Sequence, residues 1–427
     1  MNDHDELGTR LTRTLTEHSD VMSGSSLGLA DVKGRARSIR RRRTATAVVG
    51  VAAAVAVIVP TASLAAHTSG KPEPAPAITQ TPSPTTTASP DSGHQPAPGV
   101  LDVSDLPTGD APRMDYVANG VFHTADGDSF GVGTRYRPDQ FVELDDGSRV
   151  WHTTANGKAY VEIQDSDGNF HDPVASGWGL TVNASHNVVA WLDPSGQVML
   201  WEGRATEPRP LGDPIQGSDL RLGPVFGEGI GANGGSGPGC TVTGCTVYVN
   251  VTDNQGHRQV WEVSDAATQQ LRDGGYLVLN DESEAGLSIG LTEIKDFESC
   301  SKLLGGGEFQ GFETCKNQLQ SFSPDGKLIL ALPTNYDGLG PTAMAMYRLD
   351  GTRLFERQAT VHAQAAYPGA TWEDDTHVLA PFFQDGTWSI VRVGSDSNME
   401  YAVPPVSGDD VDNPFILPTG GALSAGS

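Results

Sequence analysis

The sequence predicts an all-β protein: a seven-bladed β-propeller, with six blades as the alternative, preceded by one transmembrane helix and a disordered linker. Three observations lead to this prediction. Residues 44–66 carry no charged side chain, and residues 67–114 are rich in Pro, Thr, Ser and Ala. From residue 115 onward, short alternating apolar segments are separated by Gly, Asp, Asn and Ser, which is typical of strands and hairpin turns.

Residues 1–43 are expected to form a basic cytoplasmic tail, and residues 44–66 a membrane anchor. At 1.5 Å per residue this anchor helix would be roughly 34 Å long, sufficient for the ~30 Å hydrocarbon core of a bilayer. Residues 40–43 are all arginine, and the positive-inside rule therefore places the N-terminus in the cytoplasm. A cleaved signal peptide is the alternative, because Ser-Leu-Ala at residues 63–65 is a small-x-small sequence.

Residues 67–114 are expected to stay disordered, because a segment with so few large apolar side chains cannot repay its ordering entropy by burial. This linker would hold the folded domain, residues 115–421, outside the membrane, with residues 422–427 as a flexible C-terminus. The formal net charge of the chain is −25. Such a charge argues against a nucleic-acid partner, whose phosphates require Lys and Arg, and we interpret it as a solubilising surface.

Six stretches of the folded domain each divide into four predicted strands. In residues 321–357, the turn SPDG precedes KLILAL, and a second hairpin turns at Asp350 and Gly351. Repeats of about 40 to 50 residues with four strands each are typical of propellers. The other stretches are residues 140–172, 178–213, 222–271, 276–315 and 366–403.

The two ends of the domain predict a seventh blade. Residues 116–133 contain only part of a unit, and residues 413–419 contain a single strand. Together they would close the ring, so that no strand edge is left open between the first and last blades.

All four cysteines lie beyond the predicted anchor. Cys240 and Cys245 form one close pair along the sequence, and Cys300 and Cys315 form another. An even number of cysteines on the oxidising side of a membrane suggests a disulfide within each pair. Zinc is the competing interpretation, but the spacings C-x4-C and C-x14-C fit no common zinc motif well.

Two short motifs resemble catalytic or metal sites, and we interpret both as structural. Residues 286–290 have the G-x-S-x-G pattern of a hydrolase nucleophile, but they lie in a predicted strand instead of a strand-to-helix elbow. Asp165, Asp167 and Asn169 offer alternate oxygen ligands, yet the glycine and glutamate positions of an EF-hand loop are not matched. The histidines, His152 among them, show no clustering along the sequence. We therefore expect no enzymatic activity, no cofactor and no metal.

Two features resemble the TolB-type and WD-repeat-like propellers of bacterial envelopes. They are the SFSPDG turn at residues 321–326 and the W-E-D-D-x-x-V-L pattern at residues 372–379. The Gly-His and Trp-Asp signatures of eukaryotic WD repeats are not evident, so the sequence resembles the TolB-type propellers more than the WD-repeat propellers. Members of these families include protein-interaction scaffolds, periplasmic partners and propellers attached to peptidases, so the resemblance implies a fold more than a function.

The leader resembles in layout the actinobacterial membrane proteins that sit beside extracytoplasmic-function sigma factors. Their zinc-type anti-sigma domain carries His-x3-Cys-x2-Cys, whereas no cysteine precedes Cys240 here. We expect a monomeric, membrane-anchored, non-catalytic binding or protein-interaction module at the cell surface, with an extracytoplasmic protein or glycan as ligand. The alternatives are a transmembrane signalling protein linked to a sigma factor and a carbohydrate-active enzyme on a propeller scaffold.

Overall fold

The chain divides into two compact units, residues 1–85 and residues 86–427. The computed structural model describes only part of the second unit: residues 93–203, 205–227, 244–271, 275–283, 285–295, 298–305, 311–334, 340–360 and 365–420. The predicted tail, anchor and flexible C-terminus, and most of the predicted linker, lie outside the described residues. No helix that is long and apolar enough to cross a bilayer occurs among the residues described.

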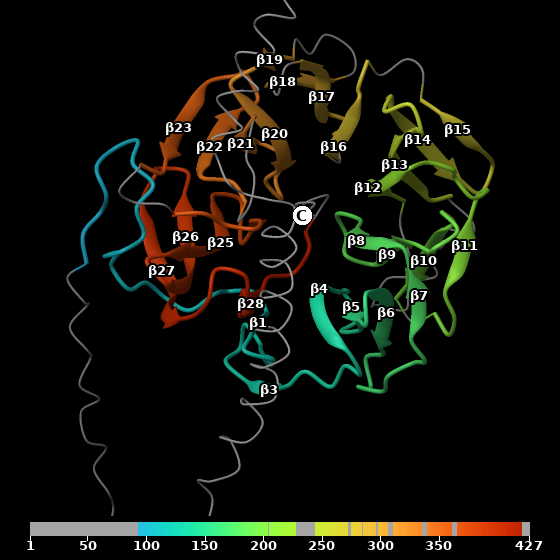
Figure 1. Cartoon of the computed structure of the whole chain (residues 1–427), viewed down its shortest axis with the longest axis horizontal. Coiled ribbons are helices and arrows are strands. Elements are labelled where there is room, and N and C mark those ends of the chain that lie inside the picture. The colour runs from blue at the N-terminus through green and yellow to red at the C-terminus, as the bar shows by residue number, and fades with distance from the viewer. Residues whose placement is uncertain are drawn as a thin grey trace, which may run out of the picture. The chain divides into compact units, whose positions relative to one another are not determined.

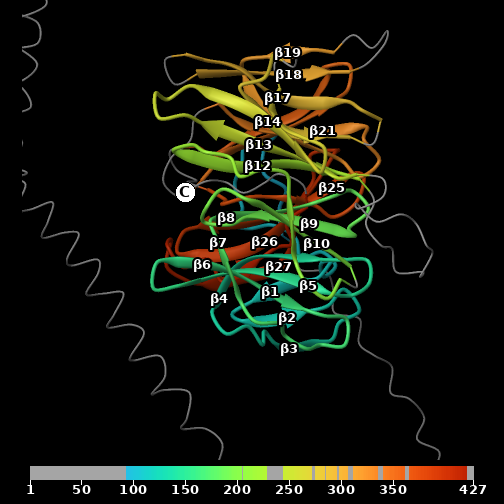
Figure 2. The same cartoon turned by 90° about the vertical axis from the view of Figure 1, so that its right-hand side faces the viewer.

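Seven four-stranded antiparallel sheets make up the described part of the second unit. They are arranged as blades around a central axis (Figure 1), and a side view shows the strands of successive blades in layers (Figure 2). Blade 1 contains β4 (Arg137–Glu143), β5 (Arg149–Ala155), β6 (Lys158–Gln164) and β7 (Val174–Ser176). Blade 2 contains β8 (Trp178–Val182), β9 (Val188–Leu192), β10 (Val198–Glu202) and β11 (Arg209–Leu211).

The next four blades repeat this order from the innermost strand outward, with β12, β16 and β20 nearest the centre in Figure 1. Blade 3 contains β12 (Asp219–Phe226), β13 (Thr246–Thr252), β14 (Arg258–Ser264) and β15 (Thr268–Gln270). Blade 4 contains β16 (Val278–Glu282), β17 (Ser288–Lys295), β18 (Glu298–Leu304) and β19 (Glu313–Thr314). Blade 5 contains β20 (Asn317–Phe322), β21 (Leu328–Pro333), β22 (Ala343–Arg348) and β23 (Arg353–Gln358). Blade 6 contains β24 (Thr371–Trp372), β25 (His377–Gln384), β26 (Thr387–Gly394) and β27 (Met399–Ser407).

Blade 7 combines the two ends of the described chain, as predicted. It contains β28 (Phe415–Ile416), β1 (Tyr116–Ala118), β2 (Val121–His123) and β3 (Ser129–Gly131), in that order across the sheet. The register pairs Val117 with Ile416 and Ala118 with Phe415. The last strand therefore completes the sheet that the first three strands begin, and the ring has seven blades.

The central strands of a blade are buried on both faces, because each blade packs between two neighbours. In β9 (VVAWL) all five residues are buried. Alternate residues face opposite neighbours: Ala190 and Leu192 pack against blade 3, whereas Val189 and Trp191 pack against blade 1. Burial on both faces explains why the central strands contain continuous apolar runs as well as alternating ones.

A recurrent D-x-x-G turn closes several hairpins. The Oδ1 atom of Asp193 accepts the backbone N–H groups of Ser195 (2.7 Å) and Gln197 (3.0 Å). Asp253 makes the same two contacts with residues 255 and 257. The glycine of each turn, such as Gly196 at φ +84°, adopts a left-handed conformation that other residues rarely reach.

Residues 93–113 correct the prediction of a linker that is disordered up to residue 114. They form a strap along the outer edges of blades 5 and 6, drawn in blue beside β23 and β27 (Figure 1). Val100 forms a parallel bridge with Gln358 of β23, and Thr108 forms one with Tyr401 of β27. The strap therefore pairs with strand edges that would otherwise be open.

Three apolar side chains of the strap explain why this part of the linker is ordered. Leu101, Val103 and Leu106 are at most 4% exposed and belong to the same apolar cluster as Met344 and Met399. The composition of the whole linker is that of a disordered chain, but the burial of these three side chains offsets part of the entropy cost of ordering the strap.

Candidate functional site

The centre of the ring contains two cavities, one at each end of the innermost strands. The N-side mouth, where these strands begin, has a volume of about 990 Å³ and is lined by blades 1, 2, 6 and 7. The C-side mouth, where they end, has a volume of about 1000 Å³ and is lined by blades 2 to 6. In β8, for example, Gly179 near the start lines the N-side mouth and Val182 at the end lines the C-side mouth.

One wall of the N-side mouth is the terminal segment, residues 413–420, which includes β28. The backbone N–H of Thr419 donates to the carbonyl oxygen of Phe141 at 2.8 Å, which holds this segment against β4. Phe415 is 2% exposed, whereas Leu417 and Pro418 are half-buried. The strand that closes the ring thus also supplies an apolar wall of the mouth.

The polar end of the N-side mouth is formed by Asp139 and His152, on neighbouring strands of blade 1. The register of β4 shifts between Pro138 and Gln140, and Asp139 lies within this irregularity. Its Oδ1 atom is 2.5 Å from Nδ1 of His152. The Asp139 side chain is 43% exposed, whereas that of His152 is 6% exposed. The mouth therefore presents the carboxylate of Asp139, whose position is fixed by its hydrogen bond to the buried ring of His152.

The His152 ring makes that one hydrogen bond only: its Nε2 atom is buried and has no partner among the described residues. The pairing with Asp139 assigns the ring proton to Nδ1, because a carboxylate accepts and does not donate. A second proton on Nε2 would be a buried donor without an acceptor, which is costly. The ring therefore holds one carboxylate oxygen of Asp139 and makes no second hydrogen bond with the described residues.

The rest of the N-side mouth is mainly apolar. The rings of Tyr136 and Tyr160 lie with centroids 4.9 Å apart, and Tyr160 lines the mouth. The backbone N–H groups of Arg135 (2.7 Å) and Tyr136 (3.1 Å) donate to the carboxylate of Glu162, which is 2% exposed. Four prolines also line the mouth: Pro194, Pro368, Pro381 and Pro418.

The C-side mouth is polar, but its acids are arranged differently. Burial raises the pKa of Asp281 to about 7, although the backbone N–H groups of Phe322 and Glu282 donate to its carboxylate. Burial also raises the pKa of Glu282. Lys327 pairs with Asp325 at 2.8 Å. Burial thus disfavours the charged forms of Asp281 and Glu282, and Asp325 is already paired with Lys327.

Three other histidines among the described residues also pair with carboxylates, which the sequence did not predict. His94 Nδ1 lies 3.2 Å from Asp105 Oδ2 in the strap. His377 Nδ1 lies 2.9 Å from Asp374 Oδ1, and His257 Nδ1 lies 3.0 Å from Asp253 Oδ2. The last two pairs stabilise hairpin turns, and none of the three lines one of the two mouths. The pair in the N-side mouth is distinguished by its cavity and by the burial of its ring.

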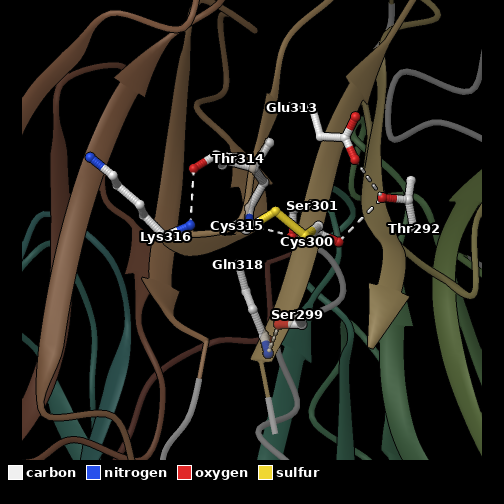
Figure 3. The surroundings of a disulfide bond; sticks show 10 residues. Thr292, Ser299, Cys300, Ser301, Glu313, Thr314, Cys315, Lys316 and Gln318 are labelled. Atoms are coloured by element: carbon white, nitrogen blue, oxygen red, sulfur yellow. Dashed lines mark hydrogen bonds between the residues drawn. A yellow bond between two sulfur atoms is a disulfide. The ribbon is translucent and has the colours of Figure 1, made fainter. Parts of the chain in front are cut away.

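A disulfide joins Cys300 and Cys315 on blade 4 (Figure 3). Cys300 lies in β18, and Cys315 lies between β19 and β20, so this bond ties an outer part of blade 4 to the connection that enters blade 5. Cys245 is also disulfide-bonded, while Cys240 lies outside the described residues. No described cysteine is free.

The two short motifs of the sequence have structural roles. Ser288 lies at the start of β17, and its hydroxyl is 3.1 Å from the hydroxyl of Tyr276. Asp165 accepts the backbone N–H groups of Asp167 (3.0 Å) and Asn169 (2.8 Å). These are the contacts of the recurrent D-x-x-G turn, so a hairpin turn accounts for the residues that resemble a calcium loop. No group of three or more candidate metal ligands occurs among the described residues.

Comparisons with known proteins find solved structures of similar fold but identify no family. No protein-family model and no curated protein matches the sequence. Among similar solved structures, YCF48 bound to D1 peptide has 10% identity and a TM-score of 0.41, covering 69% of this chain and 86% of the other. TolB from Acinetobacter baumannii has 10% identity and a TM-score of 0.40, with coverage of 69% and 77%. Dihydro-heme d1 dehydrogenase NirN has 12% identity and a TM-score of 0.39, with coverage of 76% and 81%.

TolB-type propellers are thus among the structures to which this chain is similar. At these identities and TM-scores, the similarity says nothing about the function of this chain. The seven-bladed architecture itself rests on the strand order of the chain.

Proposed function

We propose that this chain is a non-catalytic binding module that takes an extended segment of a partner protein into the N-side mouth. The observation that carries the proposal is the mouth itself: about 990 Å³, with mainly apolar walls and a smaller number of polar side chains. Ligand sites usually combine apolar walls with a small number of placed polar groups. Apolar side chains of a peptide would contact Leu417, Pro418 and Tyr160, while its polar groups would face Asp139.

The same site argues for binding rather than catalysis. An aspartate and a histidine form two parts of a nucleophilic triad, and the third part would be a hydroxyl or thiol on the free ring nitrogen. No described residue makes that contact with Nε2 of His152. Ser288 belongs to blade 4, whereas the mouth is lined by other blades.

The disulfides support a location outside the cytoplasm, where thiols are oxidised. All the cysteines that the structure describes are in disulfides: Cys245, Cys300 and Cys315. In the proposed arrangement, residues 44–66 span the membrane with the N-terminus in the cytoplasm, and the propeller acts at the cell surface.

Filling the mouth tests the proposal. Gly369 lines the N-side mouth, and an added Cβ there meets no atom within 4 Å, so we expect Gly369→Trp to fold and to block the cavity. Gly131, on the outer edge of blade 7, has equally open surroundings, and Gly131→Trp is the matched control. Full-length protein would be screened by thermal unfolding against panels of peptides, sugars and cell-wall fragments.

A ligand at 100 times its dissociation constant should add about 2.7 kcal/mol to the free energy of unfolding. We expect a peptide to produce this stabilisation in the wild type and in Gly131→Trp but not in Gly369→Trp. Stabilisation that persists in Gly369→Trp would place the binding site elsewhere. Stabilisation by sugars alone would contradict the peptide proposal.

A further inference from the structure

We propose that Asp139 anchors a positively charged side chain, so that the ligand of the N-side mouth is a basic peptide: one with a Lys or an Arg beside apolar residues. This inference rests on the proposed function, because it names the chemistry of the segment that the mouth would take. It depends on how His152 holds Asp139 and on the other charge that lines the mouth.

Asp139 is positioned before any ligand arrives. The bond from His152 Nδ1 fixes one carboxylate oxygen, and the ring that makes this bond is itself buried. The carboxylate remains 43% exposed and lines the cavity. A cationic group that docks there gains a charge-assisted hydrogen bond, and little conformational freedom of Asp139 remains to be lost.

His152 leaves part of this carboxylate available to a ligand. Its Nδ1 atom lies 2.5 Å from Oδ1 of Asp139, and its Nε2 atom is buried without a partner among the described residues. A ligand cation would therefore meet the exposed part of the Asp139 carboxylate.

Lys158 is the only other charged side chain among the described residues that line the N-side mouth. It is exposed, at the start of β6, and forms no ion pair with a described residue. A long ammonium side chain in solvent contributes little to binding an anionic ligand. The net charge of −25 also raises the local concentration of cationic partners and lowers that of anionic ones. The fixed charge and the overall field thus favour the same sign of ligand.

The experiment selects peptides without assuming their sequence. A phage-displayed library of random 12-residue peptides is panned on the full-length wild-type protein, after counter-selection on Gly369→Trp. We expect the peptides that depend on the open mouth to be enriched in Lys and Arg next to apolar residues. One selected peptide is then synthesised with its basic residue and with Gln in its place.

Two variants of the full-length protein, each compared with the wild type, give the decisive comparisons. Against the wild type, Gln in place of the basic residue should weaken binding about tenfold or more, whereas against Asp139→Asn it should have little effect. Lys158→Gln is the matched control, since it removes the other charge of the mouth. It should leave binding unchanged or tighten it, because a like charge has been removed.

His152 acts as a positioning residue, and its variants separate this role from mere packing. In His152→Gln the side chain keeps an N–H donor for Asp139, whereas in His152→Leu it does not. We expect His152→Gln to retain the preference for a basic peptide and His152→Leu to reduce it.

The outcomes distinguish this inference from the proposed function. Selected peptides without basic residues, or equal binding of the Lys and Gln peptides by the wild type, would overturn the inference while the binding site stands. A basic peptide that Asp139→Asn binds as tightly as the wild type would also overturn it. Failure to enrich any peptide that Gly369→Trp excludes would overturn the proposed function and the inference together.

Discussion

Arg149 lies between two carboxyl groups at the seam between blades 7 and 1. Its Nη2 atom is 2.9 Å from Glu143 Oε1 and 3.7 Å from Asp115 Oδ2, and its guanidinium carbon is 4.4 Å from the ring centroid of Phe122. Burial, followed by a hydrogen bond with Asp115, raises the pKa of Glu143 to about 8, although Arg149 favours its charged form. Because Arg149 is one cation beside two carboxyl groups, Glu143 and Asp115 together retain a proton at neutral pH.

We predict that the free energy of unfolding decreases as the pH rises from about 5 to about 8. Glu143 binds its proton more tightly in the folded chain, so its contribution is complete below the unfolded pKa of 4.5 and is lost as the pH passes through about 8. Asp281, with a raised pKa of about 7, also lowers the free energy of unfolding as the pH rises. Denaturant unfolding at several pH values measures this decrease.

Glu143→Gln should reduce the slope of stability against pH, because the amide cannot titrate. Glu207→Gln, at an exposed position of blade 2, is the matched control and should keep the slope of the wild type. If Glu143→Gln and the wild type show the same slope, the assignment of the proton to this seam is wrong.

The Asp139–His152 pair could not be predicted from the sequence, although the hairpin that carries it could. The turn near Asp146 predicts that β4 and β5 are neighbours, and regular pairing sets Gln140 opposite His152. The irregularity after Pro138 brings Asp139 to the ring instead. A one-residue shift of this kind leaves no mark in composition or alternation.

The strap, residues 93–113, shows how part of the predicted linker becomes part of the fold. Arg392 of β26 donates to the carbonyl oxygens of Asp110 and Ala111, both at 3.1 Å, and to the carboxylate of Glu373 at 2.8 Å. The Arg392 side chain is 4% exposed and that of Glu373 is 0% exposed. Breaking a buried ion pair of this kind is strongly destabilising, so the strap is held by polar as well as apolar contacts.

We predict that a chain beginning at residue 113 is much less stable than one beginning at residue 93. Its blades 5 and 6 would lose Leu101, Val103 and Leu106, and each large buried side chain typically contributes about 2–5 kcal/mol. The edges of β23 and β27 would also be open to pairing with other molecules. Thermal unfolding and size-exclusion chromatography measure the two effects. Equal stability and equal monomer content of the two chains would contradict this account.

The elements were largely predictable, because each blade carries its own turn chemistry. In blade 5 the residues after Asp325 alternate, and Leu330 and Leu332 share one apolar cluster as expected. The two partial units at the ends of the domain form blade 7. The strap was missed because its three apolar residues are diluted by Pro, Gly and Asp, although the alternation of Leu101 and Val103 is a signal that could have identified it.

At the scale of the whole described ring, closure and the candidate site use the same segment. Residues 413–420 complete blade 7 and line the N-side mouth, and Thr371 and Gly420 line both mouths. A ligand in the N-side mouth would contact the strand that closes the ring, so binding and ring stability should support each other.

The central claim is that the N-side mouth receives a segment of a partner protein. The most direct measurement is photo-cross-linking in intact cells from residue 154, which is exposed and lines this mouth. Residue 411, a valine that is 59% exposed and lies outside both mouths, is the control position. We predict one discrete adduct from residue 154, none from residue 411, and loss of the adduct in Gly369→Trp. An adduct that survives in Gly369→Trp, or the absence of any adduct from residue 154, would contradict the claim.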